Sequence, residues 1–470
     1  MTLPVDVLVV GGGITGLAAA HRLTRRGGIR WLLVERDPRL GGKITTDRRD
    51  GYVIEGGPDC FLGAKRPGME FCQDLGIHDR LIGTSPDFRR TYVKRDGLLR
   101  QLPAGITGLV PSQLGPLLTS SVLSLGGRLR AAMELVIPAR RGQAEESVAQ
   151  FVTRRFGREA YDWLVEPLLS GIFAGDGNAL SLTAAFPQLA ELEQRHGSIL
   201  RAMLAGSRTG HRSSGPGTSI QGFVTLPGGL AELVDTVTRQ VPSESVRLGV
   251  GVEGLRPTDG GFQARLDDGT MVRTGAVILA LPAFAAADLL YGLDPALAAR
   301  LREIPFVSTM TVSVAFPAAD VAGPLDGYGF VSPRAGGGPI VACTWTSNKF
   351  PARAPEGRVL LRFFLGRAGD EAIVAASSDT IMHVIRQELS AVLGIMAAPA
   401  LWKLYRWPRG IPQYTLGHRQ RVTAIEAAAE RHGRLALAGA SYHGIGIPDC
   451  VASGRSAVDR VLARPNVAAA

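Results

Sequence analysis

The glycines near the start of the chain have the spacing of a turn that binds a dinucleotide. The motif Gly11-Gly12-Gly13-Ile14-Thr15-Gly16 follows an apolar run over 5–10 and precedes a segment over 17–26 that we expect to be helical. Glycines at these positions let the backbone approach a pyrophosphate closely, and the free N–H groups at the start of a helix hold its negative charge. The pattern therefore predicts a phosphate-binding turn between a strand and a helix.

A single carboxylate follows at the distance at which such a unit binds a ribose. A second apolar run over 31–34 ends at Glu35, nineteen residues after Gly16, and completes a β-α-β unit. A carboxylate there accepts hydrogen bonds from ribose hydroxyls and repels a 2′-phosphate, which argues against NADP. We expect this unit to bind a dinucleotide whose ribose carries no 2′-phosphate.

Two further turns favour FAD over NAD as that dinucleotide. Gly41-Gly42-Lys43 lies soon after Glu35 and Arg36, which suits a long cofactor extended across the domain. Near the other end, the residues over 444–449 form a second glycine turn, and we expect a helix from about Asp449. The positive end of that helix would stabilise reduced, anionic flavin. Two helix starts from opposite ends of the chain are more natural around FAD than around NAD.

The elements that position these turns form a mixed pattern. We expect strands over 246–268, 270–281, 309–316, 358–365 and 435–439, helices within 128–196 and over 366–394, and a flexible crossing over 206–222. The fold class is therefore α/β (α+β overall), with a Rossmann-like dinucleotide-binding domain. A chain of 470 residues has room for about three domains.

Composition argues against several other classes of protein. The 52 Lys and Arg residues outnumber the 42 Asp and Glu residues, but they are scattered and form no nucleic-acid-binding signature. The four cysteines contain no C-x-x-C, which argues against a disulfide framework or a zinc ribbon and fits a reduced, intracellular setting. The eight histidines lack metal-ligand spacing, and no Ser-His-Asp set or paired carboxylates occur. We therefore predict no metal and name no catalytic acid or base.

Two segments indicate whether the protein crosses or contacts a membrane. The first residues lack the basic region of a cleavable signal. The segment over 101–127 contains no charged residue, but Pro103, Pro111 and Pro116 interrupt it, so we expect it not to span a bilayer. We expect a cytoplasmic protein, with peripheral membrane contact left open.

Motifs along nearly the whole chain resemble the porphyrinogen oxidases of haem synthesis, which are relatives of the flavin amine oxidases. The glycine turns at the two ends are common to all these relatives, whereas EPLLSGIFAGD over 166–176 and IPQYTLGH over 411–418 are far more specific. EGGPD over 55–59, LPGGL over 226–230 and CTWT over 343–346 continue the match. Within the family, the sequence is similar to the Gram-positive, coproporphyrin-forming branch, formerly grouped with protoporphyrinogen oxidase.

The resemblance implies a flavoprotein of amine-oxidase type with three domains. The FAD-binding domain would be discontinuous, over 1–50, 222–292 and 416–470. A substrate-binding domain built on a mixed sheet would cover 51–90, 204–221 and 293–415. A helical domain over 91–203, of the kind that related enzymes use for membrane contact or substrate entry, would complete the chain.

The resemblance also implies site residues. FAD would be bound noncovalently, although Cys450 opens the last helix. The implied cofactor contacts are Gly11, Gly12, Gly13, Ile14, Thr15, Gly16, Glu35, Arg36, Gly42, Lys43, Gly57, Pro58, Asp59, Cys60, Val252, Ile445, Gly446 and Ile447. Candidate substrate contacts are Asp59, Lys65, Arg66, Asn348 and Lys349. His418 and His443 are expected to be structural.

The implied reaction is the six-electron oxidation of coproporphyrinogen III to coproporphyrin III, with dioxygen as acceptor and hydrogen peroxide as product. Protoporphyrinogen IX is the alternative substrate. A flavin amine oxidase, a carotenoid desaturase and a non-catalytic flavin-carrying scaffold or haem-pathway regulator remain further alternatives. Other haem-pathway enzymes are candidate partners, and no nucleic acid is expected.

Overall fold

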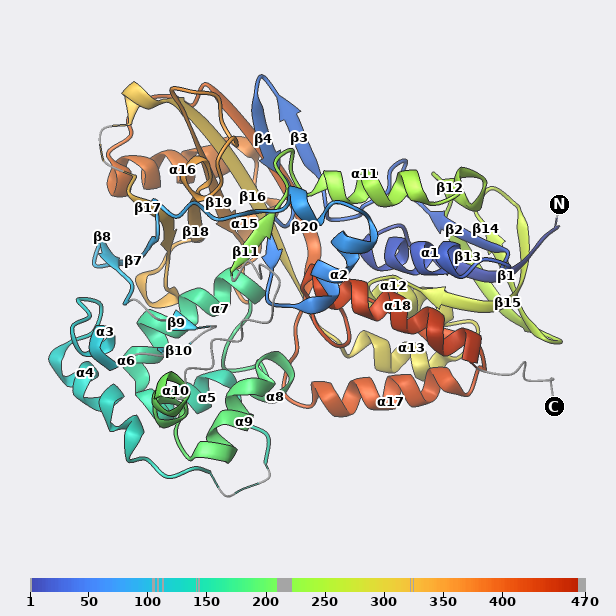
Figure 1. Ribbon diagram of the computed structural model, residues 1–470, viewed down its shortest axis with the longest axis horizontal. Coiled ribbons are helices and arrows are strands. Elements are labelled where there is room, and N and C mark those ends of the chain that lie inside the picture. Colours follow the sequence, from blue (N-terminus) through green and yellow to red (C-terminus); the bar gives the residue numbers. More distant parts are fainter. Residues whose placement is uncertain are drawn as a thin grey trace.

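The computed structural model describes residues 2–103, 106–107, 110–111, 114–140, 142, 144–208, 222–321, 323 and 325–463. Most of the predicted flexible crossing over 206–222 lies outside these residues, as does part of the uncharged segment over 101–127. Figure 1 shows the order and arrangement of the helices and strands.

The first sheet contains the predicted β-α-β unit and brings the two ends of the chain together. Its strands run in the order β12-β2-β1-β15-β14-β13, and β21 also pairs with β15. Strands β12, β2, β1, β15 and β21 are parallel, whereas β14 and β13 form an antiparallel extension. Their bounds are β1 (Thr2–Val10), β2 (Trp31–Glu35), β12 (Val246–Leu248), β13 (Val252–Thr258), β14 (Gly261–Leu266), β15 (Met271–Leu279) and β21 (Leu435–Leu437).

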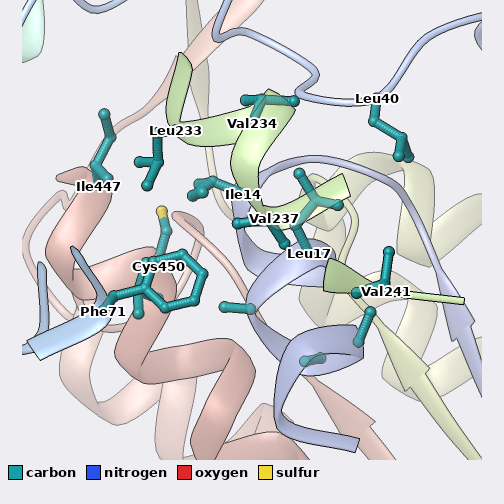
Figure 2. Close-up of a cluster of buried hydrophobic side chains, with 14 of the residues drawn as sticks. Ile14, Leu17, Leu40, Phe71, Leu233, Val234, Val237, Val241, Ile447 and Cys450 are labelled. Carbon is teal, nitrogen blue, oxygen red and sulfur yellow. The ribbon is translucent and has the colours of Figure 1, made fainter. Parts of the chain in front are cut away.

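Helices cover both faces of this sheet. Val7 and Val9 of β1 belong to one hydrophobic core, and Leu8 and Val10 to another, as the alternation of side chains along a strand requires. The first core lies beneath α1 (Ile14–Arg26), α2 (Arg66–Asp74), α11 (Ala231–Gln240) and α18 (Ile447–Ala463). The second lies beneath α12 (Ala283–Leu290), α13 (Pro295–Arg302) and α17 (His418–Glu430). Figure 2 shows the first core, where side chains of the first and last helices meet those of α11.

The second sheet is mixed, because β17 and β7 are parallel whereas the other neighbours are antiparallel. Ile381, Ile385 and Leu389 of α16 (Ser378–Leu393) are buried in the core on this sheet. The strand order is β20 (Leu401–Pro412), β16 (Phe306–Pro317), β19 (Arg358–Leu365), β18 (Ile340–Trp345), β17 (Gly327–Val331), β7 (Arg90–Arg95) and β8 (Leu98–Gln101).

Smaller elements connect the two sheets. They are the hairpin β3 (Thr46–Arg49) and β4 (Tyr52–Glu55), the strands β5 (Phe61–Leu62), β6 (Ile82–Gly83) and β11 (Phe223–Thr225), the pair β9 (Ile106–Thr107) and β10 (Val110–Pro111), and the short helices α14 (Thr346–Lys349) and α15 (Ala372–Ala375).

A helical region with its own core lies beside the second sheet (Figure 1). It contains α3 (Leu114–Leu118), α4 (Leu125–Ala132), α5 (Val148–Phe156), α6 (Arg158–Ala160), α7 (Glu166–Phe173), α8 (Leu182–Ala185), α9 (Pro187–His196) and α10 (Ile199–Arg208). No helix in the described ranges has both the length and the apolar character needed to cross a bilayer.

Most predicted elements are confirmed, with shifted bounds. The predicted strand over 246–268 is wrong in detail, because the chain forms three separate strands there and Gly249 and Gly260 adopt positive φ between them. The last helix begins at Ile447, two residues before the predicted start. The predicted single helix over 366–394 is wrong in detail, because the chain after Gly366 (φ +84°) forms two helices, over Ala372–Ala375 and Ser378–Leu393. The domain boundaries remain a prediction.

A buried ion pair stabilises the helical region. The side chains of Arg155 and Glu134 are both completely buried, and their guanidinium and carboxylate groups are in direct contact. The Glu134 carboxylate also accepts hydrogen bonds from Ser198 Oγ at 2.5 Å and from the Ile199 backbone N–H at 2.8 Å, at the start of α10. Glu134 therefore links α10 to Arg155 of α5.

We predict that Glu134→Gln lowers the free energy of unfolding by about 3 kcal/mol, because it removes the closer of the two buried carboxylates that contact the Arg155 charge. Urea unfolding followed by circular dichroism measures the change. Glu191→Gln is the control, since Glu191 is 60% exposed in its ion pair with Arg195 and should cost less than about 0.5 kcal/mol. Equal effects of the two substitutions would contradict the assigned role of Glu134.

Candidate cofactor and substrate site

The glycine turn between β1 and α1 leaves room for a ligand at one glycine and not at the others. A Cβ on Gly11 would lie 2.6 Å from the Ala280 carbonyl oxygen, and a Cβ on Gly16 would lie 1.8 Å from that of Gly11. A Cβ on Gly13 would meet nothing within 4 Å, and Gly13 has an ordinary extended backbone (φ −67°). No side chain caps α1, so its first N–H groups are available to the phosphates of a dinucleotide.

Glu35 lies against this turn. One carboxylate oxygen accepts a hydrogen bond from the Gly12 N–H at 2.5 Å, and the other accepts one from the Asp37 N–H at 2.9 Å. Each oxygen keeps a lone pair, so the carboxylate fits a ribose diol. The Val250 N–H donates to the Glu35 carbonyl at 3.0 Å, which places the start of β13, including Val252, near Arg36.

Close backbone contacts lead from the glycine turn to the segment 57–60. A Cβ on Gly42 would lie 3.3 Å from the Gly13 Cα, and a Cβ on Gly57 would lie 1.8 Å from the Lys43 carbonyl oxygen. The Lys43 ammonium donates to the Gly410 carbonyl on β20, and burial lowers the pKa of Lys43. The structure therefore brings the predicted cofactor residues 11–16, 42–43 and 57–60 together.

The second glycine turn approaches the first from the other end of the chain. The Gly444 N–H donates to the Tyr414 hydroxyl at 2.7 Å, and Ile445 packs against the core of the helical region. The Thr15 side chain in α1 lies close enough to the Cys450 thiol in α18 to affect its pKa. Burial raises the pKa of Cys450 to about 11, so it remains a thiol at neutral pH. A protonated thiol is a poor nucleophile, which fits noncovalent cofactor binding.

Two candidate substrate residues form an ion pair with each other. The Lys349 ammonium lies 3.0 Å from the Asp59 carboxylate, and both side chains are largely buried. Burial opposes ionisation of Asp59, but the charges of Lys349 and Arg362 outweigh it and hold the pKa of Asp59 well below its usual value. The Cys60 thiol donates to the same carboxylate at 3.0 Å, and burial together with the Asp59 charge raises its pKa.

The other candidate substrate residues lie apart from this pair. Lys65 forms an ion pair with Asp449 at 2.6 Å, near the start of α18. Arg66 is exposed at the first position of α2. The Asn348 amide donates to the Leu325 carbonyl. Of the four candidate substrate residues other than Asp59, only Lys349 therefore belongs to the cluster of charged side chains around Asp59.

Two buried arginines that the sequence patterns did not predict also belong to this cluster. Arg362 of β19 is 2% exposed and donates to the Gly57 carbonyl through Nη2. Arg353 is 1% exposed, donates to Thr225 Oγ1 at 2.8 Å and lies 3.6 Å from the Glu55 carboxylate. The available signal was the interruption of the apolar run over 359–365 by one arginine.

The two histidines of the C-terminal motifs have structural partners. His418 stacks on Tyr414 with ring centroids 4.0 Å apart, and its Nε2 lies 3.0 Å from the Tyr442 carbonyl oxygen. Burial lowers the pKa of His418 to about 4, so it is neutral at pH 7. His443 lies 2.8 Å from the Glu426 carboxylate. Within the described part of the chain, no group of three or more His, Cys, Asp or Glu side chains could hold a metal.

Comparison with known proteins defines the class. The chain matches the model of the flavin-containing amine oxidoreductases over residues 14–462 and belongs to that family. It is an FAD-dependent oxidase with the fold of those enzymes. Putrescine oxidase shares this fold with a TM-score of 0.69 at 17% identity, over 98% of this chain and all of that one.

Several of its relatives within the class are porphyrinogen oxidases. The chain is 38% identical to the coproporphyrinogen III oxidase of Bacillus subtilis (strain 168), over 97% of each chain. It is 31% identical to the chloroplastic protoporphyrinogen oxidase of Oryza sativa subsp. japonica, over 95% of this chain and 86% of that one. An Exiguobacterium sp. 255-15 crystal structure, assigned as a protoporphyrinogen oxidase, matches with a TM-score of 0.85 at 29% identity, over 97% and 98% of the two chains.

The residues present fit FAD. The open space at Gly13 and the uncapped start of α1 suit the pyrophosphate, and Glu35 suits the ribose. We propose that Gly57–Cys60 and Ile445–Ile447 would hold the isoalloxazine ring. When bound, FAD accepts electron pairs from the substrate and passes them to dioxygen.

We predict that Gly13→Val abolishes FAD binding without unfolding the protein. The valine side chain would fill the space that the ligand needs and would not collide with other atoms of the protein. The purified variant should lack the flavin absorbance band and keep the circular dichroism spectrum of the wild type. Gly292→Val is the control, since a Cβ there also meets nothing within 4 Å but lies far along the chain from the turn. Retention of FAD by Gly13→Val at wild-type occupancy would contradict the assignment.

Proposed function

We propose that this enzyme oxidises coproporphyrinogen III to coproporphyrin III in haem b biosynthesis. The observation that carries the proposal is full-length similarity to three coproporphyrinogen III oxidases, at 38%, 34% and 30% identity and 97% coverage of this chain. The plant protoporphyrinogen oxidases reach 27–31%. Protoporphyrinogen IX is therefore the second candidate substrate. The oxidation removes six electrons and converts three molecules of dioxygen to three of hydrogen peroxide.

This reaction requires little from side chains. The pyrroles of the substrate stabilise the positive charge left when electrons depart, so correct placement of the macrocycle supplies most of the catalysis. Asp59 is held ionised by Lys349 and Arg362, so it suits a hydrogen-bond acceptor for pyrrole N–H groups and not a proton donor. Its place beside Gly57 supports a role in orienting the substrate.

Turnover of the two porphyrinogens decides between the candidates. We expect kcat/KM for coproporphyrinogen III to exceed that for protoporphyrinogen IX at least tenfold, because one substrate has four carboxylates, the other has two, and the chain has a net charge of +10. Porphyrin fluorescence and peroxide release measure both reactions. Preference for protoporphyrinogen IX would overturn the choice of substrate, and oxidation of polyamines with no porphyrin product would indicate an amine oxidase.

An apolar stripe on the helical region supports peripheral membrane contact. Leu125, Leu129, Met133 and Val136 follow one another at helical spacing and are 71%, 60%, 52% and 70% exposed. An exposed apolar row of this kind is unusual on a soluble monomer. From residue 117 through residue 140 the only acidic residue is Glu134, which is buried, whereas three arginines occur there. Figure 1 shows α4 at the outer margin of the molecule. We infer a cytoplasmic enzyme that contacts anionic lipid through α4.

Vesicle sedimentation tests this contact. At low salt we expect the wild-type protein to bind vesicles of phosphatidylglycerol and phosphatidylcholine, and we expect Leu125→Glu with Leu129→Glu to weaken binding at least tenfold. Met396→Glu is the control, because Met396 is 81% exposed outside the stripe. Absence of wild-type binding at low salt would rule the contact out.

A further inference from the structure

Arg362 carries a buried charge that the described protein leaves partly uncompensated. Its side chain extends from β19, and its guanidinium lies 4.8 Å from the centre of the Phe364 ring. Nη2 donates to the Gly57 carbonyl, but Nε and Nη1 have no hydrogen-bond partner among the described residues. Burial lowers the pKa of Arg362, in keeping with this loss of solvation. A buried arginine ordinarily has a carboxylate in direct contact, as Arg155 has Glu134.

The neighbouring charges do not cancel it. The Asp59 carboxylate interacts electrostatically with Arg362, but it forms its direct ion pair with Lys349. Asp59, Lys349 and Arg362 together therefore carry one net positive charge. The adjacent pair of Glu55 and Arg353 adds no negative excess, because the Arg353 charge offsets that of the Glu55 carboxylate.

This positive charge lies behind the segment assigned to the flavin ring. The Gly57 carbonyl accepts the Arg362 hydrogen bond, and a Cβ on Gly57 would lie 1.8 Å from the Lys43 carbonyl oxygen. Arg362 itself is almost inaccessible, so a substrate carboxylate cannot reach it without rearrangement. A charge in a low-dielectric interior nevertheless acts through intervening backbone.

We propose that Arg362 is a positioning residue that acts through Gly57 and, with Lys349 and Asp59, sets the reduction potential of the bound FAD. The net positive charge favours the reduced flavin, which is more negative than the oxidised form. The inference rests on the flavin contact assigned to Gly57 and is independent of which porphyrinogen is oxidised. A purely structural Arg362 would shape the Gly57 turn without this electrostatic effect.

Opposite charge changes separate the two roles. In holoenzyme reduced anaerobically beside a reference dye, Arg362→Met should lower the equilibrium constant for flavin reduction at least tenfold, which is about 30 mV toward negative potential for a two-electron couple. Asp59→Asn removes a negative charge from the same cluster and should raise that constant. Lys349→Met should lower it. No porphyrinogen is present, so the result does not depend on the proposed substrate.

Arg367→Met is the matched control. Arg367 is also 2% exposed, lies just after β19 and donates to the carbonyls of Ser332 and Gly338, away from Gly57. Its flavin potential should equal that of the wild type. Should Arg362→Met fail to hold FAD, the opposite shifts of Lys349→Met and Asp59→Asn still test the proposal. Unchanged potentials, or shifts of the same sign in all three variants, would overturn it.

Discussion

A Cβ on Gly454 would lie 2.1 Å from the Thr15 carbonyl oxygen, so α18 can rest on α1 only because that residue is glycine. The same contact places the helix that follows the second glycine turn beside the helix that follows the first. Thr15 and Cys450 meet there, and the apolar side chains of both helices share one core with α11 (Figure 2). Residues separated by more than four hundred positions thereby lie together at the proposed cofactor site.

Arg155 and Arg362 are both buried, but their surroundings compensate their charges to different extents. Arg155 contacts the carboxylates of Glu134 and Glu193 and also donates to backbone carbonyls, so its charge serves the packing of the helical region. Arg362 has a single hydrogen bond, to Gly57, although it is almost as deeply buried. Since burying a charge without a counter-ion is costly, the protein retains Arg362 at some expense in stability. A cost in stability of this kind is expected where the buried charge acts on a bound group.

The sequence was most informative where function depends on backbone geometry. The glycine turn, Glu35 and the β-α-β unit could be predicted because close backbone approach restricts residue type and spacing. The buried positions Ile381, Ile385 and Leu389 followed from helical periodicity. The contacts of Lys65 with Asp449 and of Lys349 with Asp59 could not be predicted, because they join residues 384 and 290 positions apart. Local patterns contain no information about such pairs.

The ionisation states of the buried groups also explain why no catalytic acid or base emerged from the sequence. His418 is neutral, Cys450 is a thiol and Asp59 is ionised, and each keeps that state through neutral pH. Groups whose pKa lies so far from 7 are suited to fixed hydrogen bonds and fixed charge, not to proton transfer. An oxidase whose substrate stabilises its own developing charge needs positioning and a tuned cofactor more than it needs a proton shuttle. The buried ion pair at Asp59 and the unpaired charge of Arg362 meet that need with groups whose charges stay constant.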